Sequence, residues 1–259
     1  MSYSPEQIRR YLSRIGVEEP LPLCADTLTK IIFAHYCTVP YENLDILDGR
    51  PLRLDPEALF EKIVEKRRGG FCFELNEALG ALLSGLGFSV THLAARFLLG
   101  EPEGVTPMRR HHVLLVHLPD GDYLCDAGVM REAPRMALRL EHGLVQADGI
   151  GEYRFEEDPF FGHILCQRLN GKDFVPLFGF TMEPQVNADF VMPCFYCEKH
   201  PDSPFIRERM VGIYTEGGSW NLVGSSLRRL EGGRILERRE LSEEEVPATL
   251  RDIFGISQR

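Results

Sequence analysis

Cys72 stands where a protein would activate a nucleophile. Arg67-Arg68-Gly69-Gly70-Phe71 precedes it, and the apolar residues that follow recur at helical spacing as far as Leu86. Two glycines permit positive φ angles and close backbone approach, which a sharp turn into a helix requires. A thiol in the first helical turn faces the positive end of the helix dipole and free backbone N–H groups, so we expect a lowered pKa. Cys72 is therefore a candidate nucleophile, and a buried structural cysteine is the alternative.

A base and a carboxylate follow in what the pattern predicts to be a β-hairpin. His112 begins an apolar run that ends at Leu118, and a second run begins at Asp122. Between them, Pro119-Asp120-Gly121 is typical of a three-residue loop, a type I turn closed by a left-handed glycine. With that loop Leu118 faces Asp122, and this pairing sets the register of the whole hairpin.

This register places Asp126 opposite Leu114, on the strand face that Leu114 shares with His112. Diagonal neighbours lie about 7–8 Å apart at the backbone, within side-chain reach. His111 would face the other side, at the surface or behind the site. We therefore expect a Cys72–His112–Asp126 triad, in which the imidazole deprotonates the thiol and the carboxylate orients the imidazole.

The composition is that of an ordinary globular protein of 259 residues, with 44% hydrophobic and 26% charged residues. This length predicts two or three subdomains. The formal net charge of −10 argues against general binding to nucleic acid or to an anionic membrane. We expect no secretion signal at Met1–Pro5 and no membrane span. Seven cysteines, odd in number and irregularly spaced, predict a reducing compartment, the cytoplasm, rather than a disulfide framework.

The residue pattern changes twice along the chain. Residues 1–88 have mainly helical spacing, residues 89–187 have short β-type runs separated by Gly, Pro and Asp, and residues 188–259 are mixed. The pattern therefore predicts an α+β fold, with a helical domain, a small barrel or sandwich, and a mixed C-terminal part. The predicted strands of the middle part include Ser89–Phe97, Val113–Leu118, Tyr123–Cys125 and Ile164–Leu169.

Four stretches of the sequence form an ordered set of motifs. They are Val39-Pro40-Tyr41-Glu42-Asn43-Leu44, Arg68-Gly69-Gly70-Phe71-Cys72-Phe73-Glu74-Leu75-Asn76, His112-Val113-Leu114-Leu115-Val116 with Asp126-Ala127-Gly128, and His200-Pro201-Asp202-Ser203-Pro204-Phe205. The cysteine motif is specific, and in this order the four stretches together resemble the arylamine N-acetyltransferase family over nearly the whole chain.

The resemblance implies a helical bundle at 1–88, a β-barrel at 89–187, and an interdomain segment with an α/β lid at 188–259. This is a cysteine-protease-like core, and its Cys-His-Asp triad maps onto the residues chosen above. The implied enzyme is an acyltransferase of xenobiotic metabolism that uses acetyl-coenzyme A as co-substrate and no metal. The acetyl group would pass through a thioester on Cys72 to an arylamine, hydrazine or N-hydroxyarylamine in a ping-pong cycle, with His112 as the base toward the amine. No oligomeric state is predicted.

One departure concerns the acceptor pocket. The family continues Asp-x-Gly with phenylalanine and a small residue, whereas Val129 and Met130 stand here. The resemblance places that phenylalanine beside the acceptor, so its loss should widen the pocket or weaken aromatic stacking. By the same resemblance Tyr41, Phe97 and Val129 would bind substrate, with plain core packing as the alternative for the two aromatic residues. A different acyl-coenzyme A donor, or an amide synthase of secondary metabolism, is the rival function.

Other residues invite chemistry of their own. Cys194 and Cys197 form a CxxC pair that, with His163 and Cys166, supplies four candidate zinc ligands, although incidental thiols are the simpler interpretation. Glu42 and Glu74 are expected to brace the site. A cluster of arginines near Cys72 is expected to be solvated, with coenzyme A phosphates as the alternative partner; its members are Arg67, Arg68, Arg109 and Arg110.

Two rivals from other classes remain at this point. A hydrolase could use the same triad to cleave amides without coenzyme A. A non-catalytic binding module on this scaffold is the other, and the intact triad disfavours it.

Overall fold

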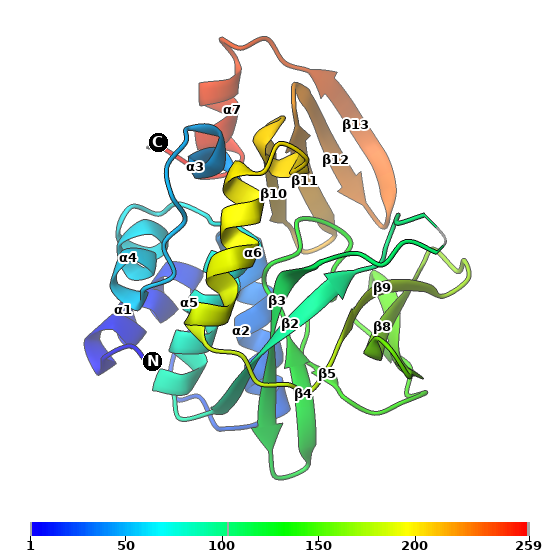
Figure 1. Ribbon diagram of the computed structural model, residues 1–259. Coiled ribbons are helices and arrows are strands. Elements are labelled where there is room, and N and C mark those ends of the chain that lie inside the picture. Colours follow the sequence, from blue (N-terminus) through cyan, green and yellow to red (C-terminus); the bar gives the residue numbers. More distant parts are fainter. Residues whose placement is uncertain (1, 103, 258–259) are drawn as a thin grey trace.

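Helices dominate the chain up to Gly85 in the computed structural model, which describes residues 2–102 and 104–257 (Figure 1). Ser4 caps the first helix by accepting a hydrogen bond from the Gln7 N–H, and Gly16 ends it with φ of 69°. The elements of this part are α1 (Pro5–Ile15), α2 (Ala25–Thr38), α3 (Leu44–Leu47), α4 (Pro56–Phe60), the π-helical turn η1 (Glu61–Glu65) and α5 (Cys72–Gly85).

The helix α5 is the centre of the helical part, because every residue from Cys72 to Leu83 is buried. A helix that is buried on all sides is normally apolar throughout. α5 nevertheless carries three buried polar residues, Glu74, Asn76 and Glu77, at 2%, 0% and 2% exposure. Each of them needs partners inside the protein, and those partners define the site described below.

An eight-stranded antiparallel sheet follows, with the order β5-β4-β3-β2-β9-β8-β7-β6. Its edge strands β5 and β6 are joined by the Gln146 side chain, which binds both the N–H and the C=O of Arg139, so the sheet is a nearly closed barrel. The predicted strand Ser89–Phe97 is confirmed. The strands are β2 (Ser89–Phe97), β3 (Arg109–Leu118), β4 (Gly121–Cys125), β5 (Leu138–Arg139), β6 (Gln146–Ala147), β7 (Gly151–Asp158), β8 (Gly162–Leu169) and β9 (Val175–Phe180).

The last part is a five-stranded sheet with the order β1-β10-β11-β12-β13, whose edge strand β1 comes from the N-terminal part. Figure 1 shows the long helix α6 running from the barrel toward this sheet, with α7 beside it at the top. The elements are β1 (Tyr41–Glu42), α6 (Asn187–Lys199), the short 3-10 turn η2 (Pro204–Ile206), β10 (Met210–Tyr214), β11 (Gly218–Val223), β12 (Ser226–Glu231), β13 (Arg234–Glu240) and α7 (Val246–Asp252).

The predicted α+β class is therefore confirmed, with a helical part, a barrel and a C-terminal α/β part. The helix α6 was not predicted. Among the described residues, no helix is both long and apolar enough to cross a membrane.

Candidate active site

The turn into α5 requires a glycine because there is no room for a side chain, and not because the φ angle is positive. A side chain at Gly69 would meet the Pro40 carbonyl oxygen at 1.9 Å, so only glycine lets the two backbones pass. The positive φ of this turn, 53°, belongs to Arg67 instead. The prediction of close backbone approach is confirmed, and it brings the segment before Cys72 against the segment that carries Tyr41.

A buried ion network fixes the same turn. Arg68 donates two hydrogen bonds to Glu42, at 2.7 and 2.8 Å, and a third to Asp45. Lys62 bridges Asp45 and Glu74 at 2.8 Å. Glu74 also accepts the N–H of Phe71, the residue before the nucleophile, at 2.9 Å. The prediction that Glu42 and Glu74 brace the site is confirmed.

The histidine that meets Asp126 is His111. Its Nε2 lies 2.7 Å from Asp126 Oδ2, and both side chains are about 97% buried. A carboxylate only accepts, so His111 Nε2 carries the proton and Nδ1 is the nitrogen that can receive one from a thiol. The prediction that His112 pairs with Asp126 is wrong.

The error has one physical cause, the length of the hairpin loop. Leu118 pairs with Gly121, so the loop between β3 and β4 has two residues and Gly121 belongs to the strand. Leu114 therefore faces Cys125 rather than Asp126. Because side chains alternate between the two faces of a strand, this shift by one residue moves Asp126 to the face of His111.

Asn76, the last residue of the cysteine motif, joins the helix to this pair, and the sequence assigned it no role. Its amide donates to Asp126 Oδ1 at 2.8 Å and to the His112 carbonyl oxygen at 2.6 Å, and its own oxygen accepts the Ala127 N–H at 2.8 Å. The Gly128 N–H donates to the same Asp126 oxygen at 2.7 Å. The carboxylate is thus held by donors on both oxygens, and its orientation toward His111 is fixed.

Cys72 lies at the edge of this arrangement. Its thiol points toward the carbonyl oxygen of Arg110, the residue before His111, 3.9 Å away. A side chain at Gly128 would lie 2.9 Å from the Cα of Cys72, so the loop after Asp126 packs directly on the nucleophile. The structure therefore brings Cys72, His111 and Asp126 to one place, where the start of α5 meets β3 and the end of β4.

Burial changes the expected acidity of the thiol. It raises the pKa of Cys72, the neighbouring Cys197 and Cys194 add to this effect, and the Phe73 backbone opposes it. The prediction of a pKa lowered by the helix dipole is therefore wrong in sign. Because a free thiolate is costly in this interior, the thiol needs an adjacent base to take its proton as it attacks.

The three expected substrate-binding residues occupy different surroundings. Phe97 packs edge-on against His111, with 5.4 Å between ring centroids. Tyr41 is buried, and its pKa is raised by burial and by the nearby Cys72 sulfur. Val129 is buried, and its carbonyl oxygen accepts a hydrogen bond from the Tyr214 hydroxyl at 3.4 Å. Phe97 and Tyr41 therefore flank the reacting groups.

The other face of β3 carries His112, in a setting unlike that of His111. Its Nε2 lies 2.9 Å from His92 Nδ1 on β2, and His92 Nδ1 lies 3.4 Å from Glu77 Oε2 on α5. Burial lowers the pKa of His92 to about 4 and that of His112 well below its ordinary value. Both imidazoles are neutral at neutral pH.

The predicted arginine cluster is partly buried, and three of its members form ion pairs within the protein. Arg68 is 4% exposed and occupied by the ion network, which contradicts both expectations for it. Arg109 pairs with Glu183, and Arg110 pairs with Glu101 while its guanidinium lies 5.6 Å from the Phe205 ring centroid.

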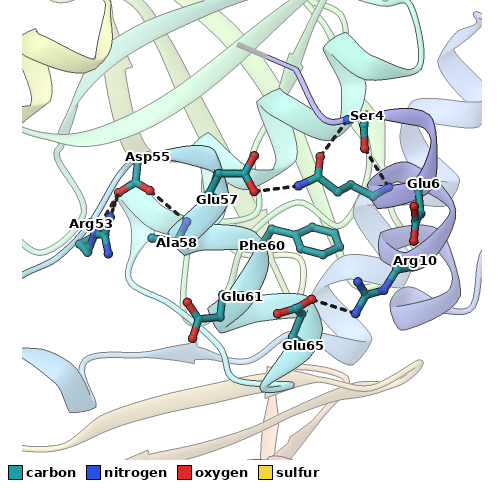
Figure 2. A pocket seen from close by; sticks show the side chains of 11 residues that line it. Ser4, Glu6, Arg10, Arg53, Asp55, Glu57, Ala58, Phe60, Glu61 and Glu65 are labelled. Carbon is teal, nitrogen blue, oxygen red and sulfur yellow. Dashed lines mark hydrogen bonds and ion pairs between the residues drawn. The ribbon is translucent and has the colours of Figure 1, made fainter.

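Two surface hollows beside the helical part are lined mainly by charged side chains. Figure 2 shows the one between α1 and α4, where Arg10 pairs with Glu65 and Gln7 reaches Glu57. The other is lined in part by members of the ion network, Asp45, Lys62, Arg68 and Glu74. Neither hollow is lined by Cys72, His111 or Asp126.

The CxxC pair does not join the other suggested zinc ligands. Cys194 and Cys197 are free, buried thiols on α6, whereas His163 on β8 bonds His142 at 2.9 Å. In residues 2–102 and 104–257, the one group of three or more potential ligand side chains whose ligand atoms converge is Glu77, His92 and His112.

Comparison with known proteins gives a consistent result. A family model described as N-acetyltransferase matches residues 25–259. The chain is 36% identical to an arylamine N-acetyltransferase of Mycolicibacterium smegmatis, covering 95% of this chain and 90% of that protein. The enzyme of the same name from Escherichia coli K12 is 31% identical, covering 96% and 88% of the two chains.

Solved structures agree. An arylamine N-acetyltransferase from Salmonella typhimurium superposes with a TM-score of 0.93 at 28% identity, covering 99% of this chain and 93% of that one. The Mycobacterium marinum arylamine N-acetyltransferase in complex with CoA gives a TM-score of 0.90 at 34% identity, covering 96% and 93%.

Proposed function

Because the chain belongs to the arylamine N-acetyltransferase family, we propose that Cys72, His111 and Asp126 carry out its acetyl transfer. The family reaction moves an acetyl group from acetyl-coenzyme A to an arylamine, and the protein is an acyltransferase with acetyl-coenzyme A as co-substrate. The observation that supports this assignment of roles is the 2.7 Å hydrogen bond from His111 Nε2 to Asp126, beside the Cys72 thiol.

The first half-reaction acylates the thiol. His111 Nδ1 takes the proton of Cys72 as the sulfur attacks the acetyl carbonyl, and Asp126 stabilises the imidazolium that forms. The bond between the acetyl carbon and the coenzyme A sulfur then breaks, and His111 returns the proton to the leaving thiolate. The N–H groups of the first turn of α5 have no intrahelical partners, so they can stabilise the oxyanion.

The second half-reaction releases the acetyl group to the acceptor. An arylamine or hydrazine nitrogen attacks the Cys72 thioester, and His111 removes the amine proton as the new bond forms. The Cys72 thiolate leaves and recovers a proton from His111. Phe97 and Tyr41 flank this position, and with Val129 they would contact the aryl ring of the acceptor.

Mass spectrometry after incubation with acetyl-coenzyme A alone tests the first half-reaction. We expect one acetyl group on Cys72 in the wild type and in His112→Gln, and none in Cys72→Ala or His111→Gln. Acetylation that persists in His111→Gln and disappears in a folded His112→Gln would overturn the choice of histidine.

The acyl donor needs its own comparison, since Val129 and Met130 replace the family's phenylalanine and small residue. A side chain at Gly212 would lie 2.6 Å from Met130 Cγ, so Met130 packs tightly on β10. The rival is a longer acyl donor or an amide synthase. Turnover of a larger thioester without acetyl transfer to any arylamine would establish that rival.

We also propose that the enzyme works in the cytoplasm. All seven cysteines are free thiols, as expected for a protein kept in a reducing compartment.

A further inference from the structure

Acetyl transfer makes no use of three polar side chains that converge behind the triad. Glu77 comes from α5, His92 from β2 and His112 from β3, and their ligand atoms all lie within 4.8 Å of one another. Glu77 and His112 are 2% and 0% exposed, whereas the His92 side chain is 19% exposed. The group is therefore built into the interior but remains reachable from solvent through His92.

The protons available to this group cannot satisfy it. His92 Nδ1 faces both His112 Nε2 at 2.9 Å and Glu77 Oε2 at 3.4 Å, yet one ring nitrogen carries at most one proton. If His92 donates to His112, Glu77 Oε2 keeps no donor, because the Asn187 side chain that hydrogen-bonds this carboxyl group does not reach Oε2. If His112 donates to His92, then His92 Nδ1 is the acceptor and has no proton to donate to Glu77 Oε2. With Glu77 ionised, either arrangement leaves its buried Oε2 without a hydrogen bond, which a native interior normally avoids.

We propose that Glu77, His92 and His112 form a binding site for a divalent transition-metal ion, with Zn²⁺ as the ion of best fit. A cation satisfies all three lone pairs at once. At Zn²⁺ bond lengths of about 2.0–2.1 Å, tetrahedral ligand atoms lie roughly 3.3 Å apart. The separation of 3.4 Å between His92 and Glu77 matches this, and the separation of 2.9 Å between the imidazoles needs only a small opening. The third separation, between Glu77 and His112, is at most 4.8 Å, and the two side chains close on the ion as it binds.

The position of the site indicates what the ion does. It joins α5, which begins at Cys72, to β2 and β3, and β3 presents His111 on its opposite face. Gly80 makes room for this arrangement, because a side chain there would meet the His92 ring at 2.7 Å. Two imidazoles and one carboxylate leave the fourth position of a tetrahedral ion for water. The ion therefore stabilises the docking of the nucleophile helix on the barrel.

Other groups in this chain can also attract the ion, so the test must separate them. Cys72, Cys194 and Cys197 are thiols, and His142 with His163 forms a second imidazole pair at 2.9 Å on the surface. The full chain carrying Cys72→Ala is stripped of metal and titrated with Co²⁺, whose visible spectrum reports tetrahedral geometry and whose thiolate charge-transfer band reports sulfur ligands. The same titration is repeated with Glu77→Gln, with His92→Gln and, as the matched control, with His142→Gln.

We expect one Co²⁺ per chain, a tetrahedral spectrum without a thiolate band, and displacement by Zn²⁺. Glu77→Gln and His92→Gln should lose this spectrum, and His142→Gln should keep it. Zn²⁺ at about 100 times its Kd should raise the Tm by about 5–10 °C, and only where both Glu77 and His92 are present. No tetrahedral spectrum, a thiolate band, or binding that survives His92→Gln in a folded protein would overturn the site.

Discussion

Asn76 is the side chain through which the helix α5 controls the triad. Its amide uses both N–H bonds and its oxygen, and all three partners lie on the segments that carry the triad histidine or carboxylate. Because Asn76 is fully buried, water cannot replace these bonds. Asn76 is therefore a positioning residue that acts through Asp126.

We expect Asn76→Ala to lower kcat by about 10- to 100-fold, as is usual when the group that orients a catalytic residue is lost. KM for the arylamine should change little, since Asn76 contacts no substrate in the proposed mechanism. Steady-state kinetics and the rate of Cys72 acetylation by acetyl-coenzyme A measure both effects. A variant that folds normally and keeps wild-type kcat would show that Gly128 alone holds Asp126.

The pH dependence of Cys72 alkylation reports its dependence on His111. Burial raises the pKa of the thiol, so without a base the thiolate forms only at high pH. We expect iodoacetamide to modify wild-type Cys72 readily at neutral pH. In His111→Gln the rate should stay low and rise only above the ordinary thiol range, about pH 8.5. Peptide mass spectrometry follows Cys72 separately from the other thiols, and superimposable profiles would remove His111 from thiol activation.

At the scale of elements, one hairpin decides which histidine meets Asp126. Pro119-Asp120-Gly121 fits a three-residue loop by composition, but Gly121 pairs with Leu118 and belongs to β4. Local sequence sets turn preferences, whereas tertiary packing of β3 and β4 selects among loops that differ by one residue. Cys72, Asp126 and the start of β3 as the source of the histidine could be predicted from the sequence. Which of His111 and His112 shares a strand face with Asp126 could not.

The same reasoning explains which elements could be predicted. Strands with alternating or continuous apolar runs could be predicted from the sequence. The bounds of β2 match to the residue, whereas β3 was predicted from Val113 and begins at Arg109. The helix α6 was missed because its apolar residues do not mark its buried face. Phe190 and Cys197 face inward, whereas Met192 and Phe195 are exposed by 75% and 62%, and Pro193 lies inside the helix. Packing by neighbouring elements, rather than its own periodicity, stabilises α6.

The ion network before Cys72 predicts a strong effect of Arg68. The Glu42 side chain is 0% exposed and Arg68 is its bidentate partner, so Arg68→Gln leaves a buried carboxylate without its counter-charge. We expect a loss of about 3–5 kcal/mol in the free energy of unfolding, measured by urea denaturation. Arg53→Gln, which breaks an exposed pair with Asp55, should cost less than about 1 kcal/mol. Equal stabilities would show that Lys62 alone compensates the acidic groups.

At the scale of the whole molecule, the C-terminal sheet is not independent of the helical part. The strand β1 pairs with β10, and Leu44 belongs to the same buried cluster as Val211, Leu222 and Phe254. We propose three structural domains, each defined by its main secondary structure. They are the helices of 1–88, the barrel of 89–187 and the α/β part of 188–259. The first and third of them nevertheless share a sheet edge and a core, so they should unfold together.

The Asn43 side chain connects the N-terminal helical part to the C-terminal part by three hydrogen bonds. Its amide donates to the carbonyl oxygens of Phe205 and Glu208 at 2.9 and 2.8 Å, and its oxygen accepts the Met210 N–H at 2.7 Å. It is 1% exposed, so truncation leaves three backbone groups without partners. Each buried unsatisfied group costs about 1–3 kcal/mol, and partial relaxation brings the expected total to about 2–4 kcal/mol.

Asn43→Ala therefore tests whether the molecule unfolds as a unit. Trp220, the only tryptophan, lies on β11 and reports the C-terminal sheet by fluorescence, while far-UV circular dichroism reports all elements. Because the segments share a core, we expect both signals to move together to lower urea concentration. Gln185→Ala, which removes an amide bonded to the nearby Glu183 and Pro184 carbonyls, should shift neither. A fluorescence transition that moves alone would show that the C-terminal sheet unfolds separately and that Asn43 merely attaches it.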